Sequence, residues 1–246
     1  DTPALPLLAG ASESRVGRPV EQFELGGGSY SRSFLNYLRG LAFLKKTADV
    51  SGVRRVLEIG GGYGTLAEIL VPGNDNLCVI DVDIPPVAAV ASYYLQEVLG
   101  AENVLTYEQC REDDALDLDD IAAGYRAAVL CPWQLPRLRG SVDLFVNFIS
   151  FQEMEPEVVA NYARLVGGLG PAWVLLRNKP EGKPLLKDDG APGVRRPTTT
   201  DDMVGMFDGF ELVARDGTVF GEQRRDGRVI SEVMVLGRPG RSRPGM

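Results

Sequence analysis

The segment VLEIGGGYGTLAEIL, residues 56–70, constrains the fold of this chain more than any other part of it. An apolar run ends in four glycines within five positions, at Gly60, Gly61, Gly62 and Gly64, and an amphipathic run follows at once. That order predicts a buried strand, a tight turn and a helix. Glycine is favoured where the backbone adopts a positive φ or lies against a ligand, so we expect a ligand at this turn.

Strand and helix patterns alternate from residue 53 onward, which predicts an α/β fold with a mostly parallel sheet. Two Asp-Gly pairs near the C-terminus favour turns, so the last two strands are expected to form an antiparallel pair at one edge of the sheet. The expected strands cover residues 54–60, 76–82, 103–107, 125–132, 141–149, 172–178, 210–216 and 229–237, and the expected helices cover 32–50, 65–71, 86–100, 155–166 and 202–207.

The chain divides into three parts by its sequence pattern. Residues 1–50 are expected to form an arm rich in Pro, Gly and Ser, followed by a helical lid with Ser31 or Ser33 as its N-cap. Residues 51–238 are expected to form the α/β domain, and residues 239–246 a disordered tail. The apolar stripe of the first helix comprises Phe34, Leu35, Leu38, Leu41, Ala42 and Leu44.

The chain contains no histidine, which excludes Ser-His-Asp hydrolases, Cys-His proteases and His-ligated zinc enzymes. Its net charge of −8 argues against nucleic acid or an anionic membrane as a partner, and no apolar run approaches the length of a spanning helix. Three cysteines without C-x-x-C spacing fit neither a zinc site nor a disulfide framework, so we expect a cytoplasmic location. The acidic run REDDALDLDD is expected to be a solvated insertion, with an ion site as the less favoured alternative.

The glycine spacing separates two classes of cofactor. A dinucleotide fingerprint needs G-x-G-x-x-G, but Thr65 occupies the position of its last glycine, and Gly64 comes one place early. Glu58 lies two residues before the turn, where its charge would repel a pyrophosphate. S-adenosylmethionine carries a sulfonium and an ammonium, and its carboxylate suits the N–H groups of a helix start. The charge of Glu58 therefore favours S-adenosylmethionine over NAD.

Two acidic residues end the second strand, in CVIDVDIP. A carboxylate at that strand end can accept hydrogen bonds from both ribose hydroxyls of a nucleoside cofactor. We prefer Asp83 to Asp81 for this contact, because Asp83 lies at the strand tip just before Pro85. The alternative is that these carboxylates only cap the following helix.

The same segments resemble a known family. VLEIGGGYGTLAEIL resembles the first motif of class I S-adenosylmethionine-dependent methyltransferases. DIPPVAAVASYYLQEVLG and DLFVNFISFQEMEPEVVANYARLV are similar to segments of bacterial sugar O-methyltransferases, which have D-x-P before a helix with Y-Y-L, and S-F-x-E-M after the fourth strand. The resemblance covers roughly Phe34–Lys179. It implies a Rossmann-like, doubly wound, seven-stranded sheet with an antiparallel last strand, and an O-methyltransferase acting on a hydroxyl of a sugar or glycosylated small molecule.

Further site residues are expected at the carboxyl edge of such a sheet. Adenine should lie near the end of AAVLCP, where Trp133 and Gln134 offer a flat apolar face and an amide, although Trp133 as a core residue is a nearly equal alternative. Asn147 stands at a strand end where metal-dependent relatives place an acid, so we expect no metal and count Asn147 among the cofactor contacts.

A sugar hydroxyl is a weak acid, and its methylation benefits from a general base. Glu153, just past the fourth strand, is the expected base, on the argument that Phe148, Phe151 and Met154 desolvate it. The alternative is that Glu153 only favours the dipole of the next helix. The expected acceptor contacts are Tyr30, Tyr37, Ser150, Gln152, Arg177, Asn178 and Lys179, with Asp202 as a weaker candidate.

Other functions stay open at this point. An N-methyltransferase of an amino sugar or small amine would need no strong base, and a non-catalytic cofactor-binding scaffold would need no base at all. A nicotinamide dehydrogenase is disfavoured by Thr65 and Glu58. The expected partner is a small-molecule acceptor, and a homodimer is possible in this architecture.

Overall fold

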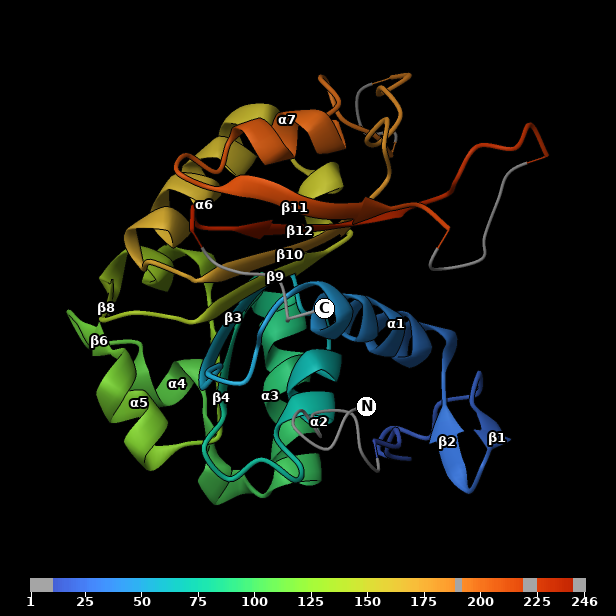
Figure 1. The fold of residues 1–246 in the computed structure, drawn as a ribbon. Helices are drawn as coiled ribbons and strands as arrows, with labels where there is room; N and C mark the ends of the chain where they lie inside the picture. Colours follow the sequence, from blue (N-terminus) through green and yellow to red (C-terminus); the bar gives the residue numbers. More distant parts are fainter. Residues whose placement is uncertain (1–10, 189–191, 219–224, 241–246) are drawn as a thin grey trace.

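The structure is a computed structural model that describes residues 11–188, 192–218 and 225–240. Its centre is an eight-stranded sheet in the order β11-β12-β10-β9-β3-β4-β7-β5, with helices on both faces (Figure 1). The strands are β3 (Arg55–Ile59), β4 (Cys78–Val82), β5 (Val104–Leu105), β7 (Ala127–Leu130), β9 (Leu144–Phe148), β10 (Trp173–Asn178), β11 (Glu211–Asp216) and β12 (Glu232–Gly237).

The helices are α1 (Arg32–Thr47), α2 (Thr65–Leu70), α3 (Pro85–Leu99), α4 (Tyr107–Cys110), α5 (Leu118–Gly124), α6 (Pro156–Gly168) and α7 (Thr200–Gly205), with 3-10 turns η1 (Ala101–Asn103), η2 (Pro132–Arg137) and η3 (Ser150–Glu153). Five of the helices of the described chain follow the alternation that the sequence predicts, whereas α4 and α5 were not predicted.

The sheet is parallel except at one edge. Strands β5, β7, β4, β3, β9 and β10 pair in parallel, whereas β12 is antiparallel to both β10 and β11. This confirms the predicted Rossmann-like sheet with an antiparallel pair at its edge. Successive strands run from β3 outward on one side and then return to β9 on the other, so the strand order reverses between β3 and β9. Ligands of open α/β sheets bind at this reversal, outside the carboxyl ends of the strands.

One predicted strand is much shorter than expected. The segment 103–107 contributes only the two residues of β5, because Thr106 begins a capping box with Gln109 and Tyr107 starts α4. The N–H of Thr106 donates to Gln109 Oε1 at 2.8 Å. This short edge strand makes the sheet eight-stranded rather than seven-stranded.

Each face of the sheet carries its own hydrophobic core, because side chains alternate along a strand. Val56 and Val79 face the core formed with α1, α2 and α3, and Leu57 and Ile80 face the core formed with α5, α6 and α7. Figure 1 shows α6 and α7 together on one side of the sheet. The glycine turn therefore sits at the end of a strand that is buried on both faces.

Helix α1 belongs to the first of these cores. Its N-cap is Ser31, whose side chain accepts a hydrogen bond from the N–H of Phe34. Of the predicted stripe, Phe34, Leu41 and Leu44 are buried in the core, whereas Leu35, Leu38 and Ala42 line a cavity of about 590 Å³ beneath the N-terminal arm. The helix that was expected to belong to a lid thus packs in the core through one face, which carries Phe34, Leu41 and Leu44.

A hairpin precedes α1 and was not predicted. Strands β1 (Phe23–Leu25) and β2 (Gly28–Tyr30) are antiparallel and joined by Gly26 and Gly27. Their φ values of 60° and 88° suit a tight hairpin turn, which needs positive φ at both central residues. The hairpin stands apart from the main sheet, next to the start of α1 (Figure 1).

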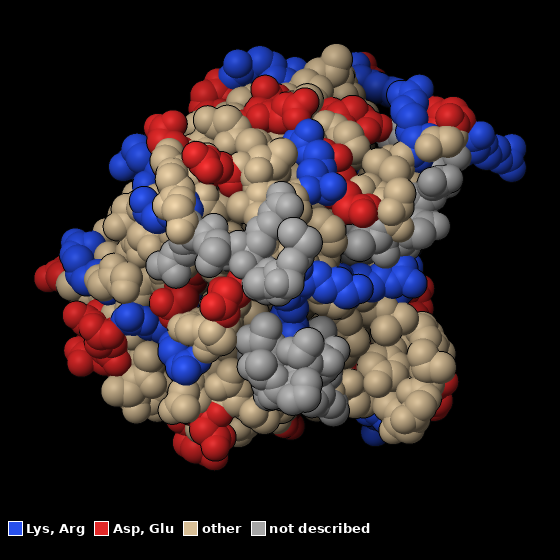
Figure 2. Space-filling model, in the orientation of Figure 1, with Lys and Arg blue, Asp and Glu red and all other residues tan. Residues whose placement is uncertain are grey.

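The acidic run is solvated, as predicted. Its apolar Leu116 and Leu118 are buried, in the short strand β6 (Leu116–Asp117) and at the start of α5. Strand β6 pairs with β8 (Leu138–Arg139). Acidic side chains gather over this region at the left edge of Figure 2. The exposed acids are Glu112, Asp113, Asp114, Asp117, Asp119 and Asp120. Most of the predicted tail, from residue 241 on, lies outside the described residues.

Candidate functional site

The glycine turn joins β3 to α2 where the strand order reverses. Gly60, Gly62 and Gly64 have φ values of 76°, 68° and 99°, which other residues rarely adopt. A Cβ on Gly60 would overlap Ser150 Oγ, and one on Gly64 would lie 2.7 Å from Leu95. A Cβ on Gly62 would meet nothing within 4 Å. Packing therefore requires Gly60 and Gly64, whereas open space lies beside Gly62.

Two buried carboxylates lie directly under this turn. Glu58 and Asp81 face each other in the register of β3 and β4, and each is 1% exposed. An ideal Cβ on Gly61 would lie 2.5 Å from Asp81 Oδ1 and 2.7 Å from Glu58 Oε2. Among the described residues, Glu58 Oε2 and Asp81 Oδ2 have no hydrogen-bond partner. Gly61 is thus required because its backbone passes over two carboxylates.

Tyr37 of α1 is the main partner of Glu58. Its hydroxyl donates to Glu58 Oε1 at 2.7 Å, and its ring stacks on Phe148 with centroids 4.6 Å apart. Tyr37 was expected to contact the acceptor, but its side chain is buried and bound to the Glu58 carboxylate. A polar tip on the apolar stripe of an amphipathic helix was the signal for this role.

Asp83 lies at the accessible end of β4. Its carboxylate accepts hydrogen bonds from the N–H of Gly62 at 2.9 Å and from the N–H of Ile84 at 2.7 Å. Asp83 is half-buried, whereas Asp81 is sealed under Gly61, whose N–H it accepts at 3.2 Å. Of the two acids at this strand end, Asp83 is therefore the one that a ligand can reach.

Burial makes all three carboxylates hard to ionise. Burial, and then the charge of Asp81, raises the pKa of Glu58 well above its usual range, although the Tyr37 hydrogen bond opposes the rise. Burial and the charge of Asp83 raise the pKa of Asp81 to about 8. Burial also raises the pKa of Asp83, against the two N–H groups that bind it. A cation bound here would stabilise the ionised forms.

Buried amides hold the neighbouring strand ends together. Asn147 Nδ2 donates to a backbone carbonyl of β3 at 2.9 Å and to Ser150 Oγ at 2.6 Å. Asn178 Nδ2 donates to Asn147 Oδ1 at 3.2 Å, and Gln152 Oε1 accepts from the N–H of Lys179 at 2.6 Å. Asn147, Gln152 and Asn178 were predicted to contact cofactor or acceptor. Their side chains instead form hydrogen bonds within the protein. They support the carboxyl ends of β3, β9 and β10.

Ile149 follows β9 with an unusual backbone conformation. Its φ of 73° is rare for a β-branched residue and costs of order 1–3 kcal/mol. The N–H of Ile149 donates to the carbonyl of Arg177 at 2.7 Å, which helps to hold this conformation. In the chain the strained residue lies between Asn147 and Ser150, whose side chains both donate to the last carbonyl of β3, and backbone strain often accompanies function.

Glu153 lies at the expected edge but in a different environment from the one expected. Its side chain is 49% exposed and its carboxylate accepts from Lys183 Nζ at 2.6 Å. Phe148 and Phe151, expected to desolvate Glu153, are themselves buried in the core. Because Glu153 is open to water and paired with Lys183, its apolar neighbours do not desolvate it as expected.

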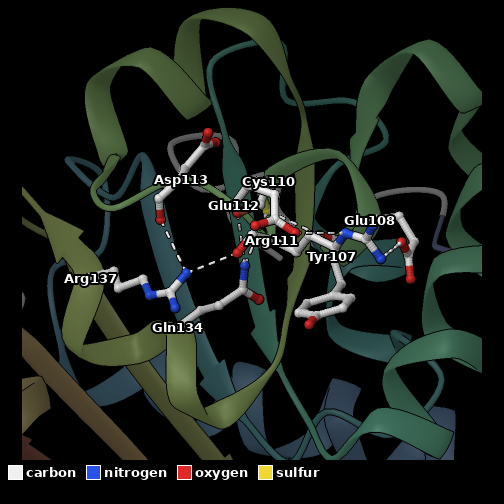
Figure 3. Close-up of polar contacts among 8 residues, drawn as sticks. All are labelled: Tyr107, Glu108, Cys110, Arg111, Glu112, Asp113, Gln134 and Arg137. Atoms are coloured by element: carbon white, nitrogen blue, oxygen red, sulfur yellow. Dashed lines mark hydrogen bonds and ion pairs between the residues drawn. The ribbon is translucent and has the colours of Figure 1, made fainter.

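The expected adenine contacts are only partly available. Trp133 is 49% exposed and packs edge-on against Tyr107, with ring centroids 5.7 Å apart. Gln134 is fully buried, and its amide donates to the carbonyl and sulfur of Cys110 while its Oε1 accepts from the N–H of Cys131. Figure 3 shows Gln134 reaching Cys110 at the end of α4, and Arg137 reaching the carbonyls of Arg111 and Asp113 just after it. Gln134 therefore has a structural role.

A pocket of about 450 Å³ lies next to these aromatic residues. It includes the first residue of α3, two positions after Asp83, and the residue that follows β7. Its walls are Pro85, Ala88, Ala89, Ser92, Tyr93, Gln96, Thr106, Tyr107, Glu108 and Cys131. The pocket combines apolar and aromatic surface with a few polar groups, as sites for flat heterocycles do.

The N-terminal arm is bound to the glycine turn and to α2 and α3, which the sequence analysis missed. Tyr63 OH donates to Glu13 Oε1 at 2.9 Å. The N–H of Ser14 donates to Glu68 Oε1 at 2.6 Å, and Tyr94 OH donates to Glu68 Oε2 at 2.9 Å. Burial raises the pKa of Glu68 to about 7, against these two hydrogen bonds. The sequence signal for this docking was the carboxylate of Glu68, which lies within the apolar helix TLAEIL.

The remaining predicted residues lie elsewhere. Tyr30 lines the cavity beneath the arm. Arg177 is buried in β10 and its Nε donates to Ser231 Oγ at 3.3 Å. Lys179 is half-buried just past β10. Asp202 accepts from the N–H and hydroxyl of Thr199 at 2.9 and 2.6 Å, so it caps α7.

Comparisons with known proteins identify the fold. No protein-family model and no curated protein matches the sequence. Solved structures do match: magnesium protoporphyrin IX methyltransferase (ChlM) from Synechocystis PCC 6803 with bound SAM has a TM-score of 0.53 at 17% identity, over 84% of this chain and 80% of that one. The protein has the fold of S-adenosylmethionine-dependent methyltransferases.

Other methyltransferase structures share this fold with the chain. The mitomycin 7-O-methyltransferase MmcR has a TM-score of 0.51 at 14% identity, over 84% of this chain but only 54% of its own length. The glycopeptide N-methyltransferase MtfA, complexed with S-adenosylmethionine, has a TM-score of 0.51 at 15% identity, over 82% and 94% of the two chains. Methyltransferases of this fold thus include O- and N-methylating enzymes. Within the described residues, no helix is both long and apolar enough to cross a membrane.

Proposed function

We propose that the protein is an S-adenosylmethionine-dependent methyltransferase that methylates a small-molecule acceptor. The observation that carries this proposal is the convergence of Glu58, Asp81 and Asp83 on the backbone of the glycine turn. Three carboxylates at this point would repel a pyrophosphate, and they complement a ligand with cationic groups and sugar hydroxyls. The missing third glycine of the dinucleotide fingerprint supports the same choice.

The chain's residues would hold the two ends of this cofactor differently. Asp83 would accept the ribose hydroxyls, because it is the accessible acid at the tip of β4. Adenine would enter the pocket beside Tyr107 and Cys131, whose wall includes Pro85, two positions after Asp83. Glu58 would favour the ammonium group from beneath the turn. When bound, the cofactor supplies an electrophilic methyl group.

For the acceptor we propose a hydroxyl of a sugar or glycosylated small molecule. The support is the resemblance of YYL and SFQEM to motifs of the bacterial sugar O-methyltransferases. The likeness in fold to a mitomycin 7-O-methyltransferase agrees with a small-molecule acceptor. N-methylation of an amino sugar is the second candidate, favoured by the likeness to a glycopeptide N-methyltransferase.

We propose Glu153 as the proton acceptor for an alcohol substrate. The proposal rests only on the position of Glu153 in the fold. This residue follows β9 and lies at the carboxyl edge of the sheet, where acceptors bind in this architecture. Lys183 would have to release its carboxylate before it could take a proton. Proximity would supply much of the remaining acceleration.

Calorimetry followed by a transfer assay tests the proposed function. Titration with S-adenosylhomocysteine (SAH) should give saturable binding in the micromolar range, about −8 kcal/mol, and NAD should give none. The protein is then incubated with labelled S-adenosylmethionine and a panel of sugars, glycosides and amino sugars, and products are identified by mass spectrometry. Binding of NAD with an affinity comparable to that of SAH would contradict the cofactor, and methylation of amines alone would favour the second candidate.

A further inference from the structure

The pair formed by Glu58 and Asp81 lacks the partners that buried charges need. Each side chain is 1% exposed, and each has one oxygen without a hydrogen-bond partner in the described part of the chain. The partners that are present, the Tyr37 hydroxyl and the Gly61 N–H, each bind only one oxygen. Buried ionised carboxylates are normally paired with a cation or fully hydrogen-bonded. Two ionised groups would therefore be very unfavourable here.

The two carboxylates are also close to each other. They are paired in register on neighbouring parallel strands, and both have an oxygen within 2.7 Å of the position of a Cβ on Gly61. Carboxylates that share a buried site keep one proton between them, because both cannot ionise at once. A proton on one oxygen turns an unpartnered acceptor into a donor toward the other group. One proton thus removes the repulsion and supplies a missing hydrogen bond.

The ionisable groups that face the pair are all acids. They are Tyr37 from α1, Asp83 from the tip of β4 and, beyond Tyr37, Tyr63 from the glycine turn. In the part of the chain that the structure describes, no Lys or Arg forms an ion pair with Glu58 or Asp81. As far as the described residues go, a positive charge for this pair would have to come from a ligand.

We propose that Glu58 and Asp81 share one proton in the free protein, and that a cationic ligand bound over the Gly61–Gly62 backbone displaces it to solvent. The inference rests on the proposed function, because the ligand is the ammonium-bearing cofactor. No covalent bond to the ligand forms: one carboxylic acid becomes a carboxylate, and its proton is taken up by buffer. Asp81 is then a specificity-determining residue, because a neutral or anionic ligand cannot replace the proton.

Proton release can be counted by calorimetry. SAH is titrated into the protein near pH 7 in phosphate and in Tris, whose ionisation enthalpies differ. The dependence of the observed enthalpy on the buffer gives the number of protons released. We expect roughly one proton per bound SAH.

Two variants and a control assign the proton. Asp81→Asn and Glu58→Gln each remove one member of the pair, and each should bind SAH with loss of the proton release. Asp75→Asn makes the same chemical change at a side chain that is 99% exposed, so it should release as many protons as the wild type. Unchanged release in both pair variants would overturn the assignment to Glu58 and Asp81.

The outcomes separate the two proposals. Binding of SAH by the wild type without proton release would overturn this inference and leave the proposed function intact. Absence of SAH binding would overturn the proposed function and this inference with it. Buffer-dependent enthalpy that Asp75→Asn alone abolishes would also overturn the inference.

A second measurement needs no ligand. Because the folded pair retains its proton above the usual carboxyl range, the stability it contributes is present at low pH and is lost as the pH rises through about 8, the raised pKa of Asp81. Asp81→Asn removes this loss, so its urea midpoint relative to wild type should rise between about pH 5 and pH 8 and level off above pH 8. A difference that is constant across this range would overturn the shared proton.

Discussion

At the residue scale, Asp83 is the carboxylate on which cofactor affinity should depend most. It is half-buried at the tip of β4 and already accepts two backbone N–H groups, so its orientation is fixed before a ligand arrives. We expect Asp83→Asn to weaken SAH binding by about 1–3 kcal/mol, the usual effect of losing a charge-assisted hydrogen bond. Asp81→Asn should weaken it less, since Asp81 is sealed under Gly61. Calorimetry at one pH measures the SAH affinity of both variants. A larger loss of affinity in Asp81→Asn than in Asp83→Asn would assign the ribose contact to Asp81.

Glu153 carries the second prediction at this scale. If an alcohol is the acceptor and Glu153 takes its proton, Glu153→Gln should lower the transfer rate by about 10²–10⁴ with little change in SAH affinity. Lys183→Met is the matched control, because it breaks the same ion pair and leaves the carboxylate in place. Single-turnover rates of the three proteins are compared. A Glu153→Gln variant with more than about a tenth of the wild-type rate would contradict a role as general base. Glu153 would then have only the role of an ion-pair partner of Lys183.

At the scale of the elements, the glycine turn offers two positions that separate folding from binding. Gly62 faces open space, so Gly62→Ala should cost only the strain of its positive φ, about 1–2 kcal/mol, while its methyl group fills ligand space. We expect SAH affinity to fall about tenfold or more, at least about 1.4 kcal/mol. Gly64→Ala adds a clash with Leu95 between α2 and α3, so it should destabilise the protein further. Urea unfolding and calorimetry check both, and a Gly62→Ala variant of normal affinity would contradict a ligand at this turn.

The docked N-terminal arm should respond to pH through Glu68. Burial raises the pKa of Glu68 to about 7, so the docked arm is most stable at low pH and loses stability as the pH rises through about 7. Trypsin should therefore cleave after Arg15, which Val16 follows, faster at about pH 8.5 than at pH 6. Glu68→Gln, digested beside the wild type at each pH, corrects for the pH dependence of the protease. Equal ratios of the two cleavage rates at both pH values would exclude Glu68 as the cause.

At the scale of the whole molecule, the proposed cofactor site lies where the two halves of the sheet meet. A ligand at the reversal between β3 and β9 contacts residues from both halves, so its binding should stabilise the entire domain. At a hundred times the dissociation constant, SAH should add about 2.7 kcal/mol and raise the Tm by about 5–10 °C. Thermal unfolding with SAH, and with NAD as the matched nucleotide, measures this effect. An equal rise with NAD would contradict the proposed choice of cofactor.

The order and type of most elements could be predicted because they depend on local pattern. The buried strand before Gly60, the helix that Pro85 begins and the antiparallel pair at the C-terminus all have clear periodicity or turn signals. The predicted length of strand β5 was too great, because the capping box at Thr106 outweighs the strand propensity of Tyr107. The hairpin around Gly26 and Gly27 was missed, since its strands are only three residues long and largely exposed.

The sequence by itself determined the glycine turn, the acids that end β3 and β4, and hence the preference for a cationic nucleoside ligand, because these depend on residue type at fixed spacing. Only the tertiary structure decided which polar side chains remain available to that ligand. Asn147, Gln152 and Asn178 are used to join strand ends, and Tyr37 is used beneath Glu58. The physical reason is that a buried polar group must find a partner inside the protein, and its partner here comes from a strand or helix distant in sequence.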